Sequence, residues 1–234
     1  MRAILLAAGF GSRLRPLTDT IPKCLVLIQG KPLLEEWLGR LSDAGIGPFL
    51  LNSHHLSEKI QNFIKNSSHR NDIEIVYEET LKGTAGTLIH NKDFFDGEDG
   101  LLIHADNYCL ENLSRFIDAH NARPAECLIT MMVFSTNAPS SCGIVEIDDR
   151  GVVIGFYEKI KNPPGNIANG AVYILSKEFI AMLDKEFANA SDFSTEILTK
   201  LVGKIFTYHT HEIFIDIGTP ENYSLANRLK EKNL

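Results

Sequence analysis

The stretch from Met1 to Lys23, MRAILLAAGFGSRLRPLTDTIPK, decides the fold. It begins with the apolar run Ala3–Ala8, which is short enough to be one buried strand. The run ends at Gly9 and Gly11, and two glycines allow a tight turn and a close approach of the backbone to a ligand. This order predicts a strand that is followed by a ligand-binding loop.

Positive charge follows the glycine turn, at Arg13, Arg15 and Lys23. Backbone N–H groups and nearby cations together bind phosphates. Two common phosphate motifs do not match, because Leu14 replaces the third glycine of the dinucleotide fingerprint and no Gly-Lys-Ser/Thr of a Walker loop follows. From these residues alone, a phosphate loop and a purely structural turn are about equally good interpretations.

The composition is that of an ordinary soluble globular protein, with 44% hydrophobic and 23% charged residues. The 234 residues allow one large α/β domain or two small ones. A net charge of −7 argues against a nucleic-acid partner, which favours a basic face, but not against a nucleotide. No apolar run reaches the roughly 18 residues that a membrane-spanning helix needs, so we expect no membrane association.

Four cysteines are scattered without Cys-x-x-Cys spacing: Cys24, Cys109, Cys127 and Cys142. We expect reduced thiols in a cytoplasmic protein, and neither disulfides nor a zinc site. His209 and His211 fall on one face of a predicted strand, but no third ligand is near them in the sequence. We therefore predict no metal site at these histidines.

Strands and helices alternate through the first half of the sequence. After the first strand we expect helix 33–44, strand 49–51, a helix from the N-cap Ser57 to Ile64, strand 73–77, a helix from Gly83, strand 101–103 and helix 110–122. This alternation predicts a parallel sheet that is covered on both faces and binds ligands at the carboxyl ends of its strands.

The second half has more strands. We expect strands 128–134, 143–147, 152–157, 168–175, 205–209 and 212–216, and helices 177–186, 194–202 and from Pro220. Asp148–Gly151 has the composition of a hairpin turn. The predicted fold class is α/β, a Rossmann-like mixed but mostly parallel central sheet flanked by helices, with an inserted β-hairpin region. Because no linker separates the halves, we predict a single domain, 1–234, with halves of about 1–123 and 124–234.

Two aspartates follow predicted strands, Asp106 and Asp216. Each alone is more often a cap of the next turn. At one edge of a sheet, however, the pair can hold one Mg²⁺, which takes carboxylate oxygens together with phosphate oxygens and water.

Read as a whole, Leu-Ala-Ala-Gly-x-Gly-x-Arg-Leu-x-Pro-Leu-Thr followed by Pro-Lys resembles the signature of the sugar-1-phosphate nucleotidyltransferases. The resemblance runs in family order to Asp216–Pro220, and it is to the short type typified by mannose- and heptose-1-phosphate guanylyltransferases. It implies Mg²⁺-dependent transfer of a nucleotidyl group from an NTP to a sugar 1-phosphate, with release of pyrophosphate. Larger members continue into a second domain, which we do not expect here because the sequence ends at Leu234.

The resemblance also implies a nucleotide site in the first half. Arg13 and Lys23 contact the triphosphate, and Asp106 and Asp216 bind the metal, although Ala105 stands where the family has Gly. The other nucleotide-binding residues that it implies are Leu6, Ala7, Ala8, Gly9, Gly11, Ser12, Glu78, Gly83, Thr84 and Ala85.

The second half then supplies the sugar phosphate site. The resemblance implies that Lys159 binds the sugar's phosphate, that Glu158 binds sugar hydroxyls, and that Gly143 and Asn169 line the site. Without the resemblance, a Glu-Lys pair is more often a surface ion pair of little energetic value. The implied catalytic set is Arg13, Lys23, Asp106, Lys159 and Asp216. It lacks a nucleophile because the sugar phosphate itself attacks.

Glu78 lies five residues before Gly83, where the family reads the base. A carboxylate accepts two hydrogen bonds, which suits the adjacent N1–H and N2–H₂ of guanine better than the single N3–H of uracil. This favours GTP, with UTP second, unless backbone amides choose the base and Glu78 faces solvent. Three alternatives stay open: uridylyl transfer to a hexose or amino-sugar 1-phosphate, cytidylyl transfer to a phosphorylated alcohol, and a non-catalytic regulator that binds a nucleotide sugar. The sugar, the oligomeric state and the pathway are not predicted.

Overall fold

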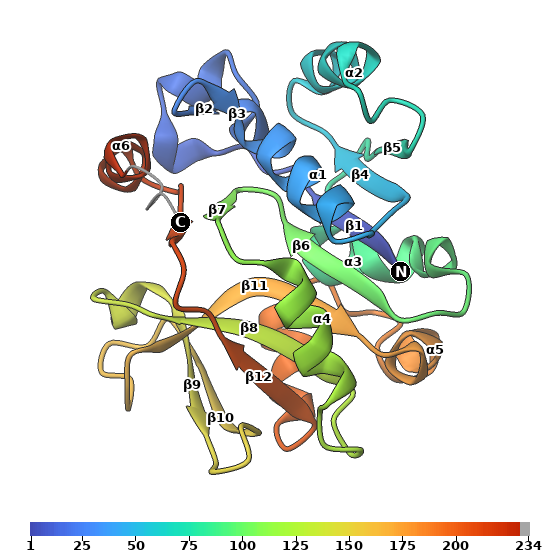
Figure 1. Ribbon diagram of the computed structural model, residues 1–234, viewed down its shortest axis with the longest axis vertical. Coiled ribbons are helices and arrows are strands. Elements are labelled where there is room, and N and C mark those ends of the chain that lie inside the picture. Colours follow the sequence, from blue (N-terminus) through green and yellow to red (C-terminus); the bar gives the residue numbers. More distant parts are fainter. Residues whose placement is uncertain (230–234) are drawn as a thin grey trace.

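The computed structural model describes residues 1–229, which build one nine-stranded sheet from both halves of the chain. Its strands are β1 (Arg2–Leu6), β4 (Phe49–Ser53), β5 (Ile73–Tyr77), β6 (Gly100–His104), β8 (Ile129–Ser135), β9 (Gly143–Ile147), β10 (Val153–Glu158), β11 (Ile167–Leu175) and β12 (Ile205–His209). The order is β10-β9-β11-β6-β1-β4-β5, and β8 pairs with both β11 and β12 (Figure 1).

The strands of the first half are parallel to one another, as their alternation with helices predicts. β1 lies between β4 and β6 in parallel register, and β4 pairs with β5. From β11 onwards the sheet is mixed, because β11 runs antiparallel to β6, β8 and β9, whereas β12 is parallel to β8. The predicted hairpin forms between β9 and β10.

Within residues 1–229 the structure has six α-helices: α1 (Leu33–Asp43), α2 (Ser57–Asn66), α3 (Gly83–His90), α4 (Leu113–Asn121), α5 (Lys177–Glu186) and α6 (Pro220–Arg228). Alternate side chains of β1 point to opposite faces of the sheet and so belong to two separate hydrophobic cores. Ala3 and Leu5 pack in the core that contains α1 and α4, and Ile4 packs on the other face with residues of α3 and α5. Ala3, Ile4 and Leu5 each have no exposed surface.

Two predicted helix starts are wrong. Ser57 is the first residue of α2 and not its cap, because its hydroxyl pairs with that of Ser53 at 2.9 Å. The predicted helix 110–122 begins only at Leu113, where Asn112 caps it, because the backbone N–H of Leu110 donates to Ile213 instead.

The predicted helix 194–202 is instead a π-turn, Phe193–Ile197, followed by a 3₁₀ turn, Leu198–Leu201. Side chains compete with the regular helical bonds here. Glu196 folds back to accept hydrogen bonds from the backbone of Ser191 and Asp192, and Asp192 accepts one from the backbone of Thr195.

Two short ribbons lie outside the main sheet. One joins β2 (Leu27–Ile28) to β3 (Lys31–Pro32), and the other joins β7 (Asn107–Cys109) to β13 (Phe214–Asp216). The second corrects the predicted strand 212–216, which was expected to end at the edge of the same sheet as the strand before Asp106. Figure 1 shows α6 beside the β2–β3 ribbon, and the backbone N–H of Gln29 donates to Asn227 of that helix at 2.8 Å.

Candidate active site

The glycine loop follows β1 and leads into a short 3₁₀ turn, Ser12–Leu14. Gly11 has a φ of 62°, and its carbonyl oxygen accepts a hydrogen bond of 2.8 Å from the Thr18 hydroxyl. A Cβ atom at this position would lie 2.9 Å from Thr18 Cγ2, so both the backbone angle and the packing require glycine. The loop is therefore held against the segment that carries Lys23.

The loop borders a hollow of about 190 Å³ at the carboxyl ends of β1 and β6. We call it the phosphate hollow. Its lining consists of residues from the loop, the β6 end and the segment after β13: Leu6, Ala7, Gly9, Gly11, Ser12, Arg13, Lys23, Cys24, Asp106 and Gly218. Arg13 and Lys23, which the sequence predicts to contact the triphosphate, are thus brought together with most of the other residues predicted to bind the nucleotide.

Lys23 connects the two aspartates. The β7–β13 ribbon sets Asp216 opposite Asn107, the residue after Asp106, and so brings the two carboxylates near each other. Lys23 Nζ lies 2.7 Å from Asp106 Oδ2 and 3.4 Å from Asp216 Oδ1, and Arg13 Nη2 lies 3.8 Å from Asp216 Oδ2. The sequence placed Lys23 on the triphosphate, whereas here it binds the carboxylates.

The Asp106 carboxyl is ionised at neutral pH. Burial by itself raises its pKa, but the positive charge of Lys23, the adjacent His104 and the hydrogen bond from Lys23 together hold the pKa below its usual range. Because one cationic atom contacts both carboxylates, this pair fits a Mg²⁺ ion, which commonly takes one or two protein carboxylates plus phosphate oxygens and water. Within residues 1–229, no third His, Cys, Asp or Glu joins them.

A second hollow, of about 230 Å³, lies between the glycine loop and α3. We call it the base hollow. It shares Leu6, Gly9 and Asp106 with the phosphate hollow, so the two hollows are adjacent. Its other lining residues are Ala8, Asn52, Glu78, Leu81, Gly83, Thr84, Thr87 and His104.

Glu78 has a different environment from the one that the sequence argument assumed. Glu78 is only 2% exposed. Its carboxylate already accepts three hydrogen bonds from the chain. Asn52 Nδ2 and the Thr87 hydroxyl donate to Oε1, and the backbone N–H of Lys82 donates to Oε2 at 3.1 Å. Asn52 Oδ1 in turn accepts from the Ala7 N–H at 2.7 Å. Glu78 therefore braces the start of the glycine loop and has little free acceptor capacity for a base.

The predicted residues at the start of α3 contact the segment 191–193. The Ala85 N–H donates to the Ser191 carbonyl, and Thr84 Oγ1 accepts from the Phe193 N–H at 2.8 Å. Gly83 has a φ of 77°, and a Cβ there would collide with the Ser191 carbonyl oxygen. Gly83 and Thr84 line the base hollow, whereas Ala85 is fully buried.

His104 lines the base hollow and is a residue that sequence reasoning did not select. It pairs with Leu6 across β6 and β1, two positions before Asp106. Its Nε2 atom is buried without a hydrogen-bond partner, and burial lowers the pKa of the ring. The available sequence signal was its position in the His104–Asn107 motif.

The predicted sugar phosphate residues gather on β9, β10 and β11. Register places Gly143 opposite Glu158, and Lys159 Nζ lies 3.0 Å from Glu158 Oε1 with a side chain 64% exposed. Asn169 Nδ2 donates to the Tyr173 hydroxyl at 2.8 Å.

This region is linked to the segment that carries Asp106. The Asn107 side chain donates to the Gly170 carbonyl at 3.1 Å, which links the residue after Asp106 to the residue after Asn169. The second half therefore contributes its predicted residues at the same end of the sheet.

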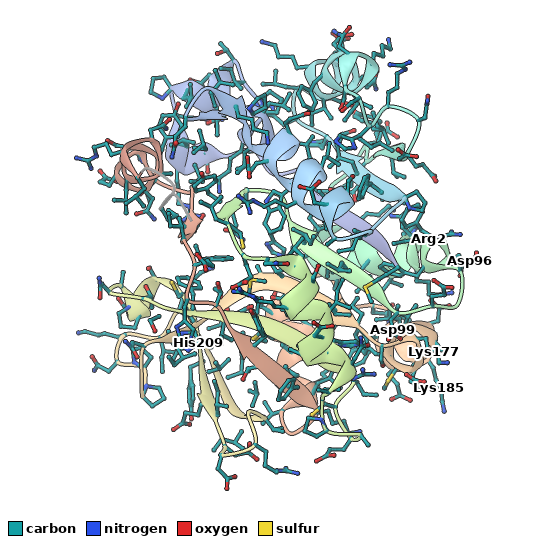
Figure 2. All side chains as sticks on the ribbon, viewed as in Figure 1. Arg2, Asp96, Asp99, Lys177, Lys185 and His209 are labelled. Atoms are coloured by element: carbon teal, nitrogen blue, oxygen red, sulfur yellow. The ribbon has the colours of Figure 1, made fainter. Side chains whose placement is uncertain are left out.

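Neither His209 nor His211 lines the phosphate hollow or the base hollow. His209, labelled in Figure 2, is the last residue of β12. Their rings are 4.8 Å apart, and His209 Nε2 is 3.2 Å from the Ser135 hydroxyl. Only His209 belongs to β12, so the predicted common strand face is wrong.

The family model described as Nucleotidyl transferase matches residues 2–233. The chain belongs to the nucleotidyl transferase family. It is similar to mannose-1-phosphate guanylyltransferase 1 of Arabidopsis thaliana, with 29% identity over 98% of this chain and 64% of the relative's length. The chain thus spans less than two thirds of that protein.

Solved structures of the family share the fold. HddC from Yersinia pseudotuberculosis, crystallised with GMP-PN, has a TM-score of 0.80 and 26% identity over 97% of each chain. A UDP-glucose pyrophosphorylase in complex with UDP-glucose has a TM-score of 0.81 and 20% identity, over 97% of this chain and 96% of that one. The predicted α/β fold and family resemblance are confirmed. In the part of the chain that the structure describes, no helix is long and apolar enough to span a membrane.

Proposed function

We propose that this nucleotidyl transferase domain moves a nucleotidyl group from an NTP to a sugar 1-phosphate and releases pyrophosphate. The observation that carries the proposal is the meeting of two cations and two carboxylates. Arg13, Lys23 and Asp106 line the phosphate hollow, and Asp216 contacts both Arg13 and Lys23. The base hollow lies next to this cluster, beside α3. A triphosphate fits the charged part, and a base with its ribose fits the less polar part.

The chemistry consists of bringing two anions together. The sugar phosphate is already a nucleophile near neutral pH, so the chain has to position it and to offset charge. Arg13 and Lys23 would bind the triphosphate and the departing pyrophosphate. Lys159, whose side chain is exposed, would bind the incoming phosphate, with Glu158 and Asn169 on the sugar.

Asp106 and Asp216 would hold a Mg²⁺ ion. When bound, the ion would supply Lewis-acid neutralisation of the phosphate oxygens. The ionised state of Asp106 supports this role, because a protonated carboxyl is a poor metal ligand.

We favour guanylyl transfer to a mannose- or heptose-type 1-phosphate. Support comes from the Arabidopsis guanylyltransferase and from the GMP-PN complex of HddC, not from Glu78, whose oxygens are largely engaged within the chain. UTP is the second candidate, because the UDP-glucose pyrophosphorylase has an equally similar fold.

The test is a pyrophosphate-release assay of four NTPs against a panel of sugar 1-phosphates. We expect the fastest turnover with GTP and a mannose- or heptose-type 1-phosphate in the presence of Mg²⁺. Faster turnover of UTP or CTP would show that the preferred nucleotide is not GTP. Binding of a nucleotide sugar without any turnover of the panel would favour the non-catalytic regulator.

A further inference from the structure

Lys23 is a nearly buried lysine whose ammonium group touches two carboxylates and faces a hollow. Its side chain is 8% exposed, and Nζ lies 2.7 Å from Asp106 and 3.4 Å from Asp216. Other lysine ion pairs in the described chain are more exposed, such as Lys31–Glu36 at 3.0 Å, in which the Lys31 side chain is 48% exposed. The Lys23 contacts are therefore held by the fold and are only weakly screened by water.

We infer that Lys23 is an internal counter-ion that occupies the carboxylate pair until a triphosphate draws it away, so that a divalent cation binds firmly only together with the nucleotide. This inference rests on the proposed function, because it assumes that the hollow accepts a triphosphate. It assigns Lys23 a second role besides phosphate contact, namely control of the order in which metal and nucleotide bind.

The charges around the two carboxylates give the physical reason. Lys23 and Arg13 together bring two positive charges to Asp106 and Asp216, so this cluster is already neutral without a metal. A free divalent cation would meet that ammonium group at contact distance, and like charges so close oppose binding strongly.

A triphosphate changes the balance. It brings several negative charges into the hollow that Arg13, Lys23 and Ser12 line. The ammonium group then has new partners within the same hollow, and the carboxylates are free for the cation. Lys23 can make this exchange without unfolding its segment, because the hollow already borders its side chain.

The experiment measures Mn²⁺ binding to the nucleotide-free chain by electron paramagnetic resonance, which needs no turnover. The variants are Lys23→Met, Lys23→Gln, which keeps a hydrogen-bond donor without charge, and Lys31→Met as the matched surface control. We expect Lys23→Met and Lys23→Gln to bind Mn²⁺ about tenfold or more tightly than the parent, because one adjacent opposite charge shifts carboxylate affinities by about that much. Lys31→Met should bind as the parent does.

Two further measurements sharpen the result. Adding Asp106→Asn to Lys23→Gln should abolish the gain, which locates the bound Mn²⁺ at the aspartates. A non-hydrolysable NTP should increase Mn²⁺ affinity in the parent far more than in Lys23→Gln. Equal or weaker Mn²⁺ binding in a folded Lys23→Gln protein would overturn the inference. Failure of the parent to release pyrophosphate from any NTP would instead count against the proposed function, whatever the Mn²⁺ titration gives.

Discussion

Two polar clusters in this protein each pair a nitrogen-bearing side chain with aspartate, but one borders a hollow and the other lies in the core. In the phosphate hollow, Lys23 is shared between Asp106 and Asp216 at unequal distances, and both carboxylates are partly exposed. In the core, His120 is fully buried, with Nδ1 2.7 Å from the Thr130 hydroxyl and Nε2 3.2 Å from Asp99.

The core cluster has a partner for every polar atom of the His120 ring. A neutral ring donates from Nε2–H to Asp99 and accepts at Nδ1 from Thr130. Asp99 also accepts from the backbone N–H of Lys177 at the start of α5, beside which Figure 2 shows it. This network joins α4, β8 and α5. The comparison teaches that satisfied buried networks hold a fold, whereas a cluster open to a hollow can exchange partners.

The largest expected effect on turnover comes from substituting the two aspartates at the phosphate hollow. Asp106→Asn or Asp216→Asn should reduce turnover by about 10³-fold or more, because each would remove one of the two proposed metal ligands and unbalance the charges around Lys23. The melting temperature should change little, since both side chains are partly exposed. Pyrophosphate release and calorimetry check this, with Asp19→Asn, an exposed aspartate outside the hollow, as the control. Undiminished turnover in either variant would remove that aspartate from the site.

Substitution of Glu78 tests whether a buried hydrogen-bond network can both stabilise the fold and contribute to base recognition. Glu78→Gln places an NH₂ group among donors from Asn52, Thr87 and Lys82, so we expect a loss of about 1–3 kcal/mol in unfolding free energy. The neighbouring Glu79→Gln, on an exposed residue, is the matched control. Urea denaturation measures both. An unchanged stability for Glu78→Gln, with a narrower preference for GTP over UTP, would return Glu78 to base recognition.

The core cluster should make stability depend on pH. Burial and nearby Arg123 lower the pKa of His120 to about 4 in the folded protein, although Asp99 opposes the shift, and an unfolded histidine titrates near 6.5. The unfolded chain therefore takes up the proton first, and stability falls as pH drops from about 6.5 to 4, by on the order of 2 kcal/mol.

Denaturant melts at several pH values test this dependence. His120→Asn should flatten the curve in that range but not abolish it, because burial also lowers the pKa of His104. The exposed His90→Asn should leave the curve unchanged. A His120→Asn curve that is parallel to that of the parent would show that His120 is not the titrating group.

The smallest effect should come from the sugar side. Lys159→Ala removes an exposed ammonium group, so we expect about tenfold weaker sugar 1-phosphate binding, unchanged NTP binding and an unchanged melting temperature. Isothermal calorimetry with each ligand measures sugar 1-phosphate binding and NTP binding separately. Lys161→Ala, two residues further along the chain, is the control. Equal loss of NTP binding would place Lys159 on the nucleotide instead.

The sequence by itself determined the local features of the protein. A continuous apolar run located β1, and apolar spacings of three and four located α1, because these patterns depend on which sides of an element face the core. The order of the motifs identified the family and selected four charged residues that the structure brings into contact: Arg13, Lys23, Asp106 and Asp216.

Tertiary structure decided what depends on residues far apart in the chain. The β7–β13 ribbon, and not the main sheet, brings Asp216 to Asp106 across more than a hundred residues. Glu78 accepts hydrogen bonds from Lys82 just before α3, from Thr87 of α3 and from Asn52 of β4, and the contact with β4 is one that no local pattern encodes. Lys23 contacts two carboxylates because the β7–β13 ribbon sets Asp216 beside the residue that follows Asp106. Local patterns specify which residue types are present, whereas partners and burial arise only when distant segments pack together.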